Sequence, residues 1–407
     1  MNTESLAAKA CRYLDELCLK IPTRRVGCQG NRDATAFFKS VIEEFNFHVD
    51  QQPFKCIDMR QGEIRLSADG QVFEAFISPH SLGCDIAALL VSVSTVEELH
   101  EIEAKGMLLL LHGEIAKEQL MPKNFVFYNP EEHQRIYRLL EEKQPVAVIT
   151  ATTRNPDAVG AIYPFPMIED GDFDIPTAFM TAEDGAKLAA FAGTLVSLKM
   201  DSIRIPSTGE NIVARKGSRM DRKVVVCAHI DTKENTPGAL DNASGVAILM
   251  LLAELLKDYQ VQLGVEIVAL NGEEYYCAPG QMEYLGRAEG TWQNIVLAVN
   301  LDDIGYFKDR SAYSLYGVPE DVSKIVRTVY NGREGFFEGP AWYQSDHGIF
   351  MAKGIPAMAI TEESYMELLA EITHSPKDRP DIVDPGKLTG NAEALYDLII
   401  AMDRGLL

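Results

Sequence analysis

Three stretches of the chain that are typical of buried β-strands end in residue types that bind metals or move protons. The stretches are KVVVCAHI, GVEIVALN and IVLAVNLD, and each is almost continuously apolar. In an open α/β sheet, functional residues gather just beyond the carboxyl ends of the strands. One charged strand end means little, but three in succession form a group of candidates: His229 and Asp231, Glu273 and Glu274, and Asp302 and Asp303.

Two later histidines and one more aspartate extend this group. Three of the eight histidines lie in this half of the chain, in HID, SDHGIF and THSPKD: His229, His347 and His374. Asp241 follows the first strand end in GALDNASG. Taken alone, Asp241 is typical of a helix N-cap. A strand–loop–helix unit would nevertheless place it over the same edge of the sheet, so we count it among the candidates.

The mixture of imidazole and carboxylate side chains favours zinc over calcium or magnesium, which prefer oxygen ligands alone. Two histidines with three or four carboxylates are too many for one tetrahedral zinc ion, but they suit a pair bridged by a carboxylate. In such a site one residue of the pair Glu273–Glu274 binds metal and the other accepts a proton from water. Cobalt and manganese are the alternative metals, because geometry and availability decide between them.

The order of elements around these residues predicts an α/β fold. From residue 222 onwards, apolar strands alternate with helices that we expect at about 242–257, 319–331, 346–353 and 391–404. Strands that are apolar on both sides belong to a sheet covered on both faces. Two further helices are expected at 4–20 and 33–46. We therefore predict a three-layer sandwich with a mixed, mainly parallel central sheet.

Residues 58–198 have a different texture, in which short strands alternate with short helices and no metal-ligand or nucleophile types cluster. We expect this region to be an inserted, smaller β-rich α/β domain. Residues 1–57 and 199–407 would then form one catalytic domain around it.

Whole-chain properties exclude several classes of partner. The 407 residues carry 38 basic and 60 acidic side chains, a formal charge of −22, which opposes binding to nucleic acids and anionic lipids. The seven cysteines are scattered without a CxxC pair, and the N-terminal segment lacks the apolar core of a signal peptide. No apolar run reaches the roughly 18 residues of a membrane helix. We expect a cytoplasmic protein with no membrane contact. The sequence leaves open whether the protein forms a homo-oligomer.

Six motifs, in this order, resemble those of the co-catalytic zinc aminopeptidases. They are H-x-D, G-A-x-D-N-x-S-G, E-E, N-x-D, S-D-H and H-S-P-x-D. The same group, clan MH, holds bacterial leucine aminopeptidases, glutamate carboxypeptidase II and glutaminyl cyclase. The resemblance is strong over residues 200–407 and weak over the first 57, where R-x-V-G-x-x-G-N precedes a helix. The region 58–198 resembles a protease-associated domain in its position and texture.

The resemblance implies a site with two zinc ions. His229 and Asp302 would hold one ion, Glu274 and His374 would hold the other, and Asp241 would bridge them.

The resemblance also implies roles for the residues around the metals. Glu273 would be the general base and then the acid that protonates the leaving amine, and Asp231 would orient the ring of His229. The peptide bond between Asp241 and Asn242 would be cis.

The resemblance to the family gives weaker indications of which residues contact the substrate. Asp346 and His347, in the S-D-H motif, would shape the site, and Tyr343 would stabilise the tetrahedral oxyanion. Two positions depart from the family pattern. Tyr275, which is followed by Tyr276 and Cys277, would narrow the pocket or add a phenol to it. Asp303 would bind a substrate amine or face away, and it competes with Asp302 for the ligand assignment.

The reaction that follows is hydrolysis of a peptide or small amide by a zinc-dependent exopeptidase. A carboxylate-rich site favours a protonated α-amine, and no arginine cluster accompanies the motifs to bind a C-terminal carboxylate. We therefore predict an aminopeptidase. A carboxypeptidase, a small-amide hydrolase and a glutaminyl cyclase are alternatives on the same scaffold, and a catalytically inactive peptidase-like binding protein is a second kind of alternative.

Overall fold

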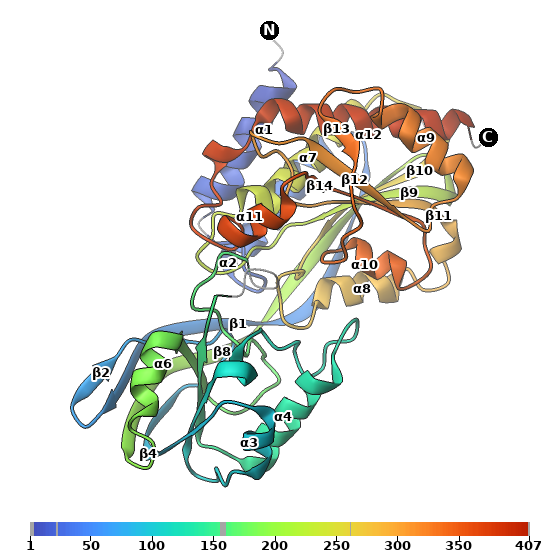
Figure 1. Cartoon of the computed structure of the whole chain (residues 1–407). Coiled ribbons are helices and arrows are strands. Elements are labelled where there is room, and N and C mark those ends of the chain that lie inside the picture. Colours follow the sequence, from blue (N-terminus) through green and yellow to red (C-terminus); the bar gives the residue numbers. More distant parts are fainter. Residues whose placement is uncertain (1–3, 22, 155–159, 261, 406–407) are drawn as a thin grey trace. The chain divides into compact units, whose positions relative to one another are not determined.

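The computed structural model describes residues 4–21, 23–154, 160–260 and 262–405, and the chain divides into two compact units. The larger unit comprises residues 1–56 and 208–407, and the smaller comprises residues 57–207. Both boundaries fall inside long strands, β1 (His48–Ala68) and β8 (Leu195–Lys216). Figure 1 labels the helices and strands of both units.

The described part of the larger unit contains one sheet, to which parts of β1 and β8 belong, and the helices that cover it. In addition to the end of β8, its strands are β9 (Arg219–His229), β10 (Leu263–Leu270), β11 (Ile295–Leu301), β12 (Ser311–Tyr316), β13 (Phe336–Glu338) and β14 (Ala357–Glu362). Its α-helices are α1 (Leu6–Asp15), α2 (Gln29–Glu43), α7 (Gly245–Leu255), α8 (Pro279–Arg287), α9 (Glu320–Tyr330), α10 (His347–Met351), α11 (Tyr365–Glu371) and α12 (Pro385–Gly405). Short π or 3₁₀ turns are η1 (Glu16–Lys20), η3 (Ala239–Ser244), η4 (Trp292–Asn294) and η5 (Pro380–Ile382).

The strand order places the three chemically marked strands side by side. The order across the larger unit is β13-β12-β14-β11-β9-β10-β8. Strands β14, β11, β9 and β10 run parallel, while β12 pairs antiparallel with β14 and β8 antiparallel with β10. The chain leaves β9 for β10 on one side and later returns to β11 on the other. This is a topological switch point, where open α/β sheets bind ligands.

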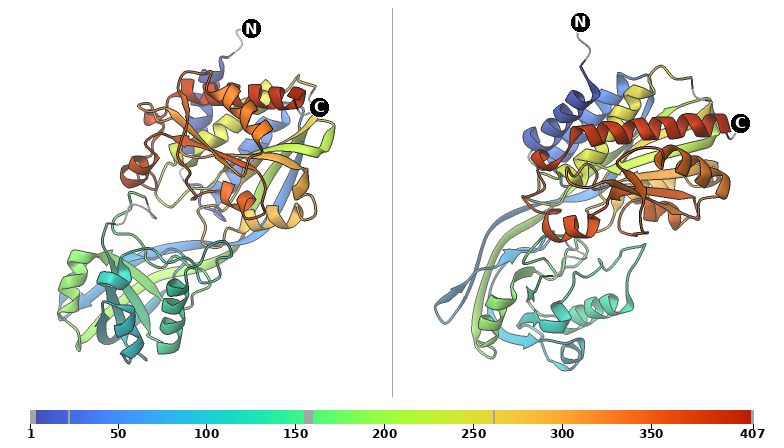
Figure 2. Two further views of the ribbon diagram at one scale, coloured as in Figure 1. Left: turned by 45° about the vertical axis from the view of Figure 1, so that its right-hand side comes forward. Right: turned by 45° about the horizontal axis from the view of Figure 1, so that its top comes forward.

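Helices cover both faces of this sheet, which makes three layers. Figures 1 and 2 show α1, α7 and α12 over one face, and α8 and α10 over the other. Nine of the eleven residues of α7 are buried, because it packs between the sheet and the outer helices α1 and α12. None of the helices in the described part of the chain is long and apolar enough to span a bilayer.

The predicted fold class, an α/β sandwich with a mixed and mainly parallel sheet, is confirmed. Several element bounds differ from the predictions. The helix expected at 242–257 begins at Gly245, and the one expected at 391–404 begins at Pro385. The sequence analysis named neither α8 nor α11, which are only nine and seven residues long.

The smaller unit is an α/β unit with its own core. Besides its parts of β1 and β8, its strands are β2 (Gln71–Phe73), β3 (Phe76–Ile77), β4 (Cys84–Val93), β5 (Leu108–His112), β6 (Ala147–Thr152) and β7 (Thr177–Thr181). Its helices are α3 (Val96–Glu101), η2 (Gly113–Ala116), α4 (Glu131–Lys143) and α6 (Ala182–Ala189). Strands β4, β5, β6 and β7 are parallel, and apolar clusters pack on both sides of them. Its likeness to a protease-associated domain stays a prediction.

The last residue of β14, Glu362, is a buried carboxylate that makes stability depend on pH. Only 1% of its surface is exposed, and it accepts hydrogen bonds from the Gly305 amide (2.6 Å) and the Ser311 hydroxyl (3.3 Å). Burial raises the pKa of Glu362 from 4.5 to about 7, although Lys387 and the hydrogen bonds oppose the shift. The folded state therefore holds this proton at pH values where the unfolded state has lost it. As the pH rises through this window, the wild-type protein loses stability.

We expect Glu362→Gln to become relatively more stable than the wild type as the pH rises from about 5 to 8, by up to roughly 3 kcal/mol. Thermal unfolding of both proteins across that range measures the change. Glu363→Gln is the matched control, because Glu363 is exposed, pairs with Arg310, and has a lowered pKa. Its stabilising interaction is already complete at pH 5, so its difference from wild type should stay flat. Equal pH trends for the two variants would contradict the prediction.

Candidate metal centre and active site

The parallel strand ends bring the candidate residues to one edge of the larger unit's sheet. In the register, His229 lies opposite Leu270, the last residue of β10, while Cys227 lies opposite Asn300 in β11. The residues that follow each strand therefore emerge together. Asp302 is tied to the neighbouring strand as well, because its amide donates to the carbonyl of Ile360 in β14 (3.1 Å).

The first group of converging side chains is His229, Asp241 and Asp302, all buried. The Nε2 atom of His229 lies 3.1 Å from Asp241 Oδ1 and 3.3 Å from Asp302 Oδ1. Burial alone would lower the pKa of His229, but Asp302 and Asp241 raise it well above its usual value. The ligand atoms of the group all lie within 4.8 Å of one another.

The second group is Asp241, Glu274 and His374, and it shares Asp241 with the first. The Nε2 atom of His374 lies 2.9 Å from Asp241 Oδ2 and 3.2 Å from Glu274 Oε1. Asp241 thus presents one carboxylate oxygen to each histidine. Burial would raise the pKa of Asp241, but its hydrogen bonds with His229 and His374 hold it well below the usual range.

This donor set fits a pair of cations. Each Nε2 atom carries at most one hydrogen, yet each faces two carboxylate oxygens. Asp302 Oδ1 and Glu274 Oε1 are fully buried and accept no hydrogen bond from the described residues. A cation within each group would satisfy all of these lone pairs. Imidazole with carboxylate is a ligand set that zinc accepts.

The loop that carries Asp241 is held from two sides. The Asp378 carboxylate accepts hydrogen bonds from the amides of Leu240 (2.7 Å) and Asp241 (3.0 Å). The side chain of Asn242 donates to the carbonyl of Leu301 (2.7 Å) and accepts from the amide of Gly245 (3.1 Å). The Asp241–Asn242 peptide bond is cis. Asp241 does not cap α7, so the N-cap interpretation is wrong: the helix begins four residues later.

Gly245 lets this loop approach the end of β11. A Cβ atom at Gly245 would lie 2.3 Å from Asn242 Oδ1 and 2.9 Å from the Leu301 carbonyl oxygen. We expect Gly245→Ala to displace Asp241 and Asp302 together, to weaken metal binding at least tenfold, and to cost about 1–3 kcal/mol of stability. Titration against a chelating indicator and thermal unfolding measure the two effects.

The control for that variant is Gly390→Ala, in helix α12. A Cβ atom there would meet nothing within 4 Å, so this substitution should leave metal affinity unchanged and stabilise the helix slightly. Wild-type metal affinity in Gly245→Ala would show that the close approach does not hold the ligands.

Asp231 holds the turn that bears the two glutamates. Its Oδ1 accepts from the amides of Gly272 (2.7 Å) and Glu273 (3.2 Å), and its Oδ2 accepts from the amide of Glu274 (3.1 Å). The expected contact with His229 is made differently, because the ring Nδ1 lies 3.1 Å from the Asp231 carbonyl oxygen and 3.8 Å from its carboxylate. The carboxylate therefore acts mainly on the glutamate turn.

Glu273 differs from its neighbour Glu274 in having no hydrogen bond or ion pair to its carboxylate among the described residues. Burial raises the pKa of Glu273 well above its usual value; His229 opposes this shift, and Glu274 and Asp346 add to it. A partner-free carboxylate with a raised pKa beside two cation-binding groups has the properties of a general base.

Two residues of the S-D-H motif, Asp346 and His347, are buried and lie outside the metal-binding groups. Asp346 is buried and accepts from Gln281 Nε2 (2.9 Å), while burial raises the pKa of Asp346 to about 7. His347 is fully buried, and its Nε2 lies 2.8 Å from the Trp342 carbonyl oxygen. Neither residue belongs to the two metal-binding groups, in keeping with the shaping role expected for them.

The predicted substrate-side residues lie in contrasting environments. Tyr275 is buried, with its ring 4.4 Å from that of Tyr276. Asp303 is buried with an unpartnered Oδ1, and burial raises its pKa well above the usual value, with Asp241 and Asp302 adding to the shift. Tyr343 is 67% exposed, and its ring packs on Tyr316.

Sequence reasoning missed three residues that act around the centre. Asp378 is the last residue of the H-S-P-x-D motif and was given no role. Arg24, 1% exposed, donates to four carbonyl groups, including those of Pro237 (2.9 Å) and Gly238 (2.7 Å), and so fixes the loop before Asp241. It is the arginine of R-x-V-G-x-x-G-N, and this motif was the signal that could have found it. No pattern in the sequence marks Tyr365, the third of these residues.

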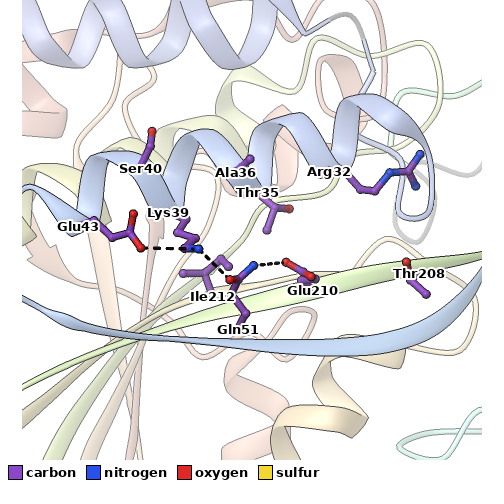
Figure 3. Close-up of a pocket in the computed structure, with 10 residues that line it drawn as sticks. All are labelled: Arg32, Thr35, Ala36, Lys39, Ser40, Glu43, Gln51, Thr208, Glu210 and Ile212. Atoms are coloured by element: carbon purple, nitrogen blue, oxygen red, sulfur yellow. Dashed lines mark hydrogen bonds and ion pairs between the residues drawn. The ribbon is translucent and has the colours of Figure 1, made fainter.

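A cavity of about 420 Å³ in the larger unit lies apart from this centre. Figure 3 shows it between α2 and the strands β1 and β8, and none of the candidate site residues lines it. Its polar side chains already bind one another: Lys39 donates to Gln51, and Gln51 donates to Glu210 (both 2.8 Å). The metal-binding groups are therefore the candidate active site.

Comparison with known proteins agrees with this geometry. The model of peptidase family M28 matches residues 211–399. Among curated proteins, an uncharacterised Escherichia coli protein, YfbL, is 26% identical over 244 residues, covering 49% of this chain and 74% of YfbL. Leucine aminopeptidase 2 of Trichophyton equinum is 25% identical over 199 residues, covering 45% of this chain and only 40% of the fungal protein.

Solved structures share the fold over nearly the whole chain. An aminopeptidase from Aneurinibacillus sp. strain AM-1 superposes with a TM-score of 0.75 at 21% identity, over 97% of this chain and 93% of that one. BSAP, a zinc aminopeptidase from Bacillus subtilis, superposes with a TM-score of 0.74 at 19% identity, over 97% and 94%. Residues 211–399 of this chain are thus similar to peptidase family M28, and the chain shares the fold of these aminopeptidase structures.

Proposed function

We propose that this chain is a zinc-dependent aminopeptidase that removes N-terminal residues from peptides. The observation that carries the proposal is the pair of histidine–carboxylate groups that share Asp241. The carboxylate of Glu273, which has no hydrogen bond or ion pair from the residues that the structure describes, lies beside them. Such a pair is suited to two metal ions. The names of similar proteins, leucine aminopeptidase and zinc aminopeptidase, support the same activity.

In this proposal His229 and Asp302 would hold one zinc ion, Glu274 and His374 would hold the second, and Asp241 would be shared by both. When bound, the ions would polarise the scissile carbonyl. They would also lower the pKa of a water molecule, so that it can lose a proton and attack near neutral pH. Asp231, Asp378 and Arg24 hold the ligand-bearing loops through backbone hydrogen bonds.

Glu273 moves the proton in this scheme. Its carboxylate takes a proton from the attacking water, whose oxygen bonds to the carbonyl carbon. When the tetrahedral species collapses, the C–N bond breaks and the same proton passes from Glu273 to the leaving amine.

Asp303 supports the choice of an amine-bearing substrate. Its Oδ1 is buried and receives no hydrogen bond from the residues described, which supports the proposal that it accepts one from the protonated α-amine of a substrate.

A substrate panel on metal-loaded protein tests the proposal. Aminoacyl-naphthylamides should be cleaved, and N-blocked dipeptides and N-terminal glutaminyl peptides should be left unchanged. Cleavage of the blocked set alone would point to a carboxypeptidase or amide hydrolase, and pyroglutamyl product would point to a cyclase. Fewer than one metal ion per chain, with no turnover of any substrate, would favour a binding protein.

A further inference from the structure

The strongest feature outside the established parts of the site is Tyr365, the first residue of α11. It follows β14 by three residues, and β14 runs parallel to β11 in the same sheet. Helix α11 therefore begins near the sheet edge at which β11 ends and Asp302 emerges. Across the described ranges, no hydrogen bond to the Tyr365 hydroxyl is found; the buried hydroxyls of Tyr137 and Tyr330 also lack a partner there, so a role for Tyr365 rests on its position.

The ring of Tyr365 is held in place by Trp342. Their ring centroids lie 4.8 Å apart at an interplanar angle of 39°. Trp342 is itself fixed, because its carbonyl oxygen lies 2.8 Å from His347 Nε2 and its amide donates to the Tyr316 hydroxyl (2.9 Å). A tyrosine that is stacked in this way has little freedom to move its hydroxyl when a substrate binds.

The segment that carries Trp342 is tied directly to a metal-ligand candidate. The Ser345 hydroxyl donates to Asp302 Oδ2 (2.6 Å), and Asn300 Nδ2 donates to Ser345 Oγ (2.8 Å). The stacked pair is therefore positioned relative to the end of β11. This gives Tyr365 the rigid placement that a preorganised hydrogen-bond donor needs.

The electrostatic surroundings of the hydroxyl agree with this placement. Burial raises the pKa of Tyr365 well above its usual value, and Asp303, Asp302, Asp241 and Glu273 add to the shift. The phenol thus lies near the carboxylates of the centre and keeps its proton, so it can donate. Tyr343, the tyrosine expected in this role from the family resemblance, is 67% exposed and packs on Tyr316.

We propose that Tyr365, and not Tyr343, donates a hydrogen bond to the oxygen of the scissile carbonyl as that carbon becomes tetrahedral. The proposal rests on the proposed function, since it assumes that an amide carbonyl is attacked at this centre. A donor of this kind stabilises charge that develops only in the transition state, so it acts on kcat more than on KM.

Tyr365→Phe tests the proposal, because it removes the hydroxyl and keeps the ring that stacks on Trp342. With an aminoacyl-naphthylamide, kcat should fall about 10²- to 10³-fold, while KM stays within about threefold. Metal content and thermal stability should equal those of the wild type. Tyr343→Phe, which also removes one phenol hydroxyl, should keep wild-type kcat.

A binding measurement separates this proposal from the proposed function. An α-aminoalkylboronic acid forms a tetrahedral adduct, whereas a free amino acid keeps a planar carboxylate. Tyr365→Phe should bind the boronic acid about 10²-fold more weakly, with unchanged affinity for the amino acid. If the wild type cleaves no aminoacyl substrate but this selective loss is seen, the function fails and the role of Tyr365 stands.

Two outcomes would overturn the role of Tyr365. One is a kcat within about threefold of wild type in Tyr365→Phe with unchanged binding of the boronic acid. The other concerns Tyr365→Ala. If that variant changes only KM, and by an amount that depends on the size of the substrate side chain, the ring of Tyr365 lines the substrate pocket and its hydroxyl has no role in the transition state. Should Tyr365→Phe fold poorly, fluorotyrosine at position 365 replaces it: its more acidic hydroxyl should move the alkaline limb of the kcat profile to lower pH.

Discussion

Glu273→Gln should abolish turnover and leave both metal ions bound. The carboxylate of Glu273 has no hydrogen bond or ion pair in the described part of the chain, so its replacement by an amide of the same shape breaks no contact that holds the site. An amide cannot accept the proton of the attacking water, and general-base catalysis contributes about 10²- to 10⁴-fold. We expect kcat to fall by that factor, with unchanged metal content and melting temperature.

The neighbouring residue provides the matched control. Glu274→Gln makes the same chemical change one residue away, but Glu274 Oε1 lies 3.2 Å from His374 Nε2 within a metal-binding group. This variant should lose metal as well as activity, and excess zinc should restore part of its turnover. Zinc should not rescue Glu273→Gln. If the two variants behaved alike in metal analysis, the division of roles between the glutamates would be wrong.

The candidate residues of the centre could be named from the sequence because the strand ends and the residues that follow them are neighbours in the chain. A strand end and the residue types that follow it are neighbours in the chain, so HID, NGEE and NLDD could be recognised without a structure. The parallel direction of β9, β10 and β11 then brings the three ends together. Asp241 could be placed for the same reason, since its loop connects β9 to the next helix.

The residues that were missed act through contacts between distant segments. Arg24 binds the loop at Pro237 and Gly238 from more than 200 residues away, and Asp378 binds the amide of Asp241 across 137 residues. Neither contact leaves a periodic or spacing signal. Asn31 and Asn271 likewise exchange hydrogen bonds of 2.8 and 2.9 Å between side chains 240 residues apart. These contacts explain why the short N-terminal motif accompanies the six later motifs.

The predicted ends of helices were wrong where contacts with distant parts of the chain determine them. Asp241 and Asn242 have non-helical backbone angles, although a helix was predicted to begin at residue 242. The amides of Leu240 and Asp241 donate hydrogen bonds to the Asp378 carboxylate. Tyr365 was missed for a similar reason. Nothing in TEESYMELL distinguishes it from a surface residue until Trp342, 23 positions earlier, is found stacked on its ring.

Asp241→Asn should have the largest effect on metal binding of any single substitution in the site. Asp241 presents Oδ1 to His229 and Oδ2 to His374, so it is the one residue common to both metal-binding groups of the described chain. An amide offers one oxygen and one NH₂ group, and the NH₂ group cannot bind a cation. We expect both ions to bind at least tenfold more weakly and turnover to be lost. Metal analysis after dialysis against a weak chelator, together with kcat, measures this.

Asp302→Asn shows whether the shared position of Asp241 is what matters. Asp302 belongs only to the group with His229, so its substitution should cost one ion and leave the second near wild-type affinity. The two aspartates are both buried and undergo the same chemical change, which removes burial and charge as explanations of any difference. Loss of one ion in both variants would mean that Asp241 serves a single metal. Loss of two ions in Asp241→Asn and one in Asp302→Asn is the result that a bridging carboxylate requires.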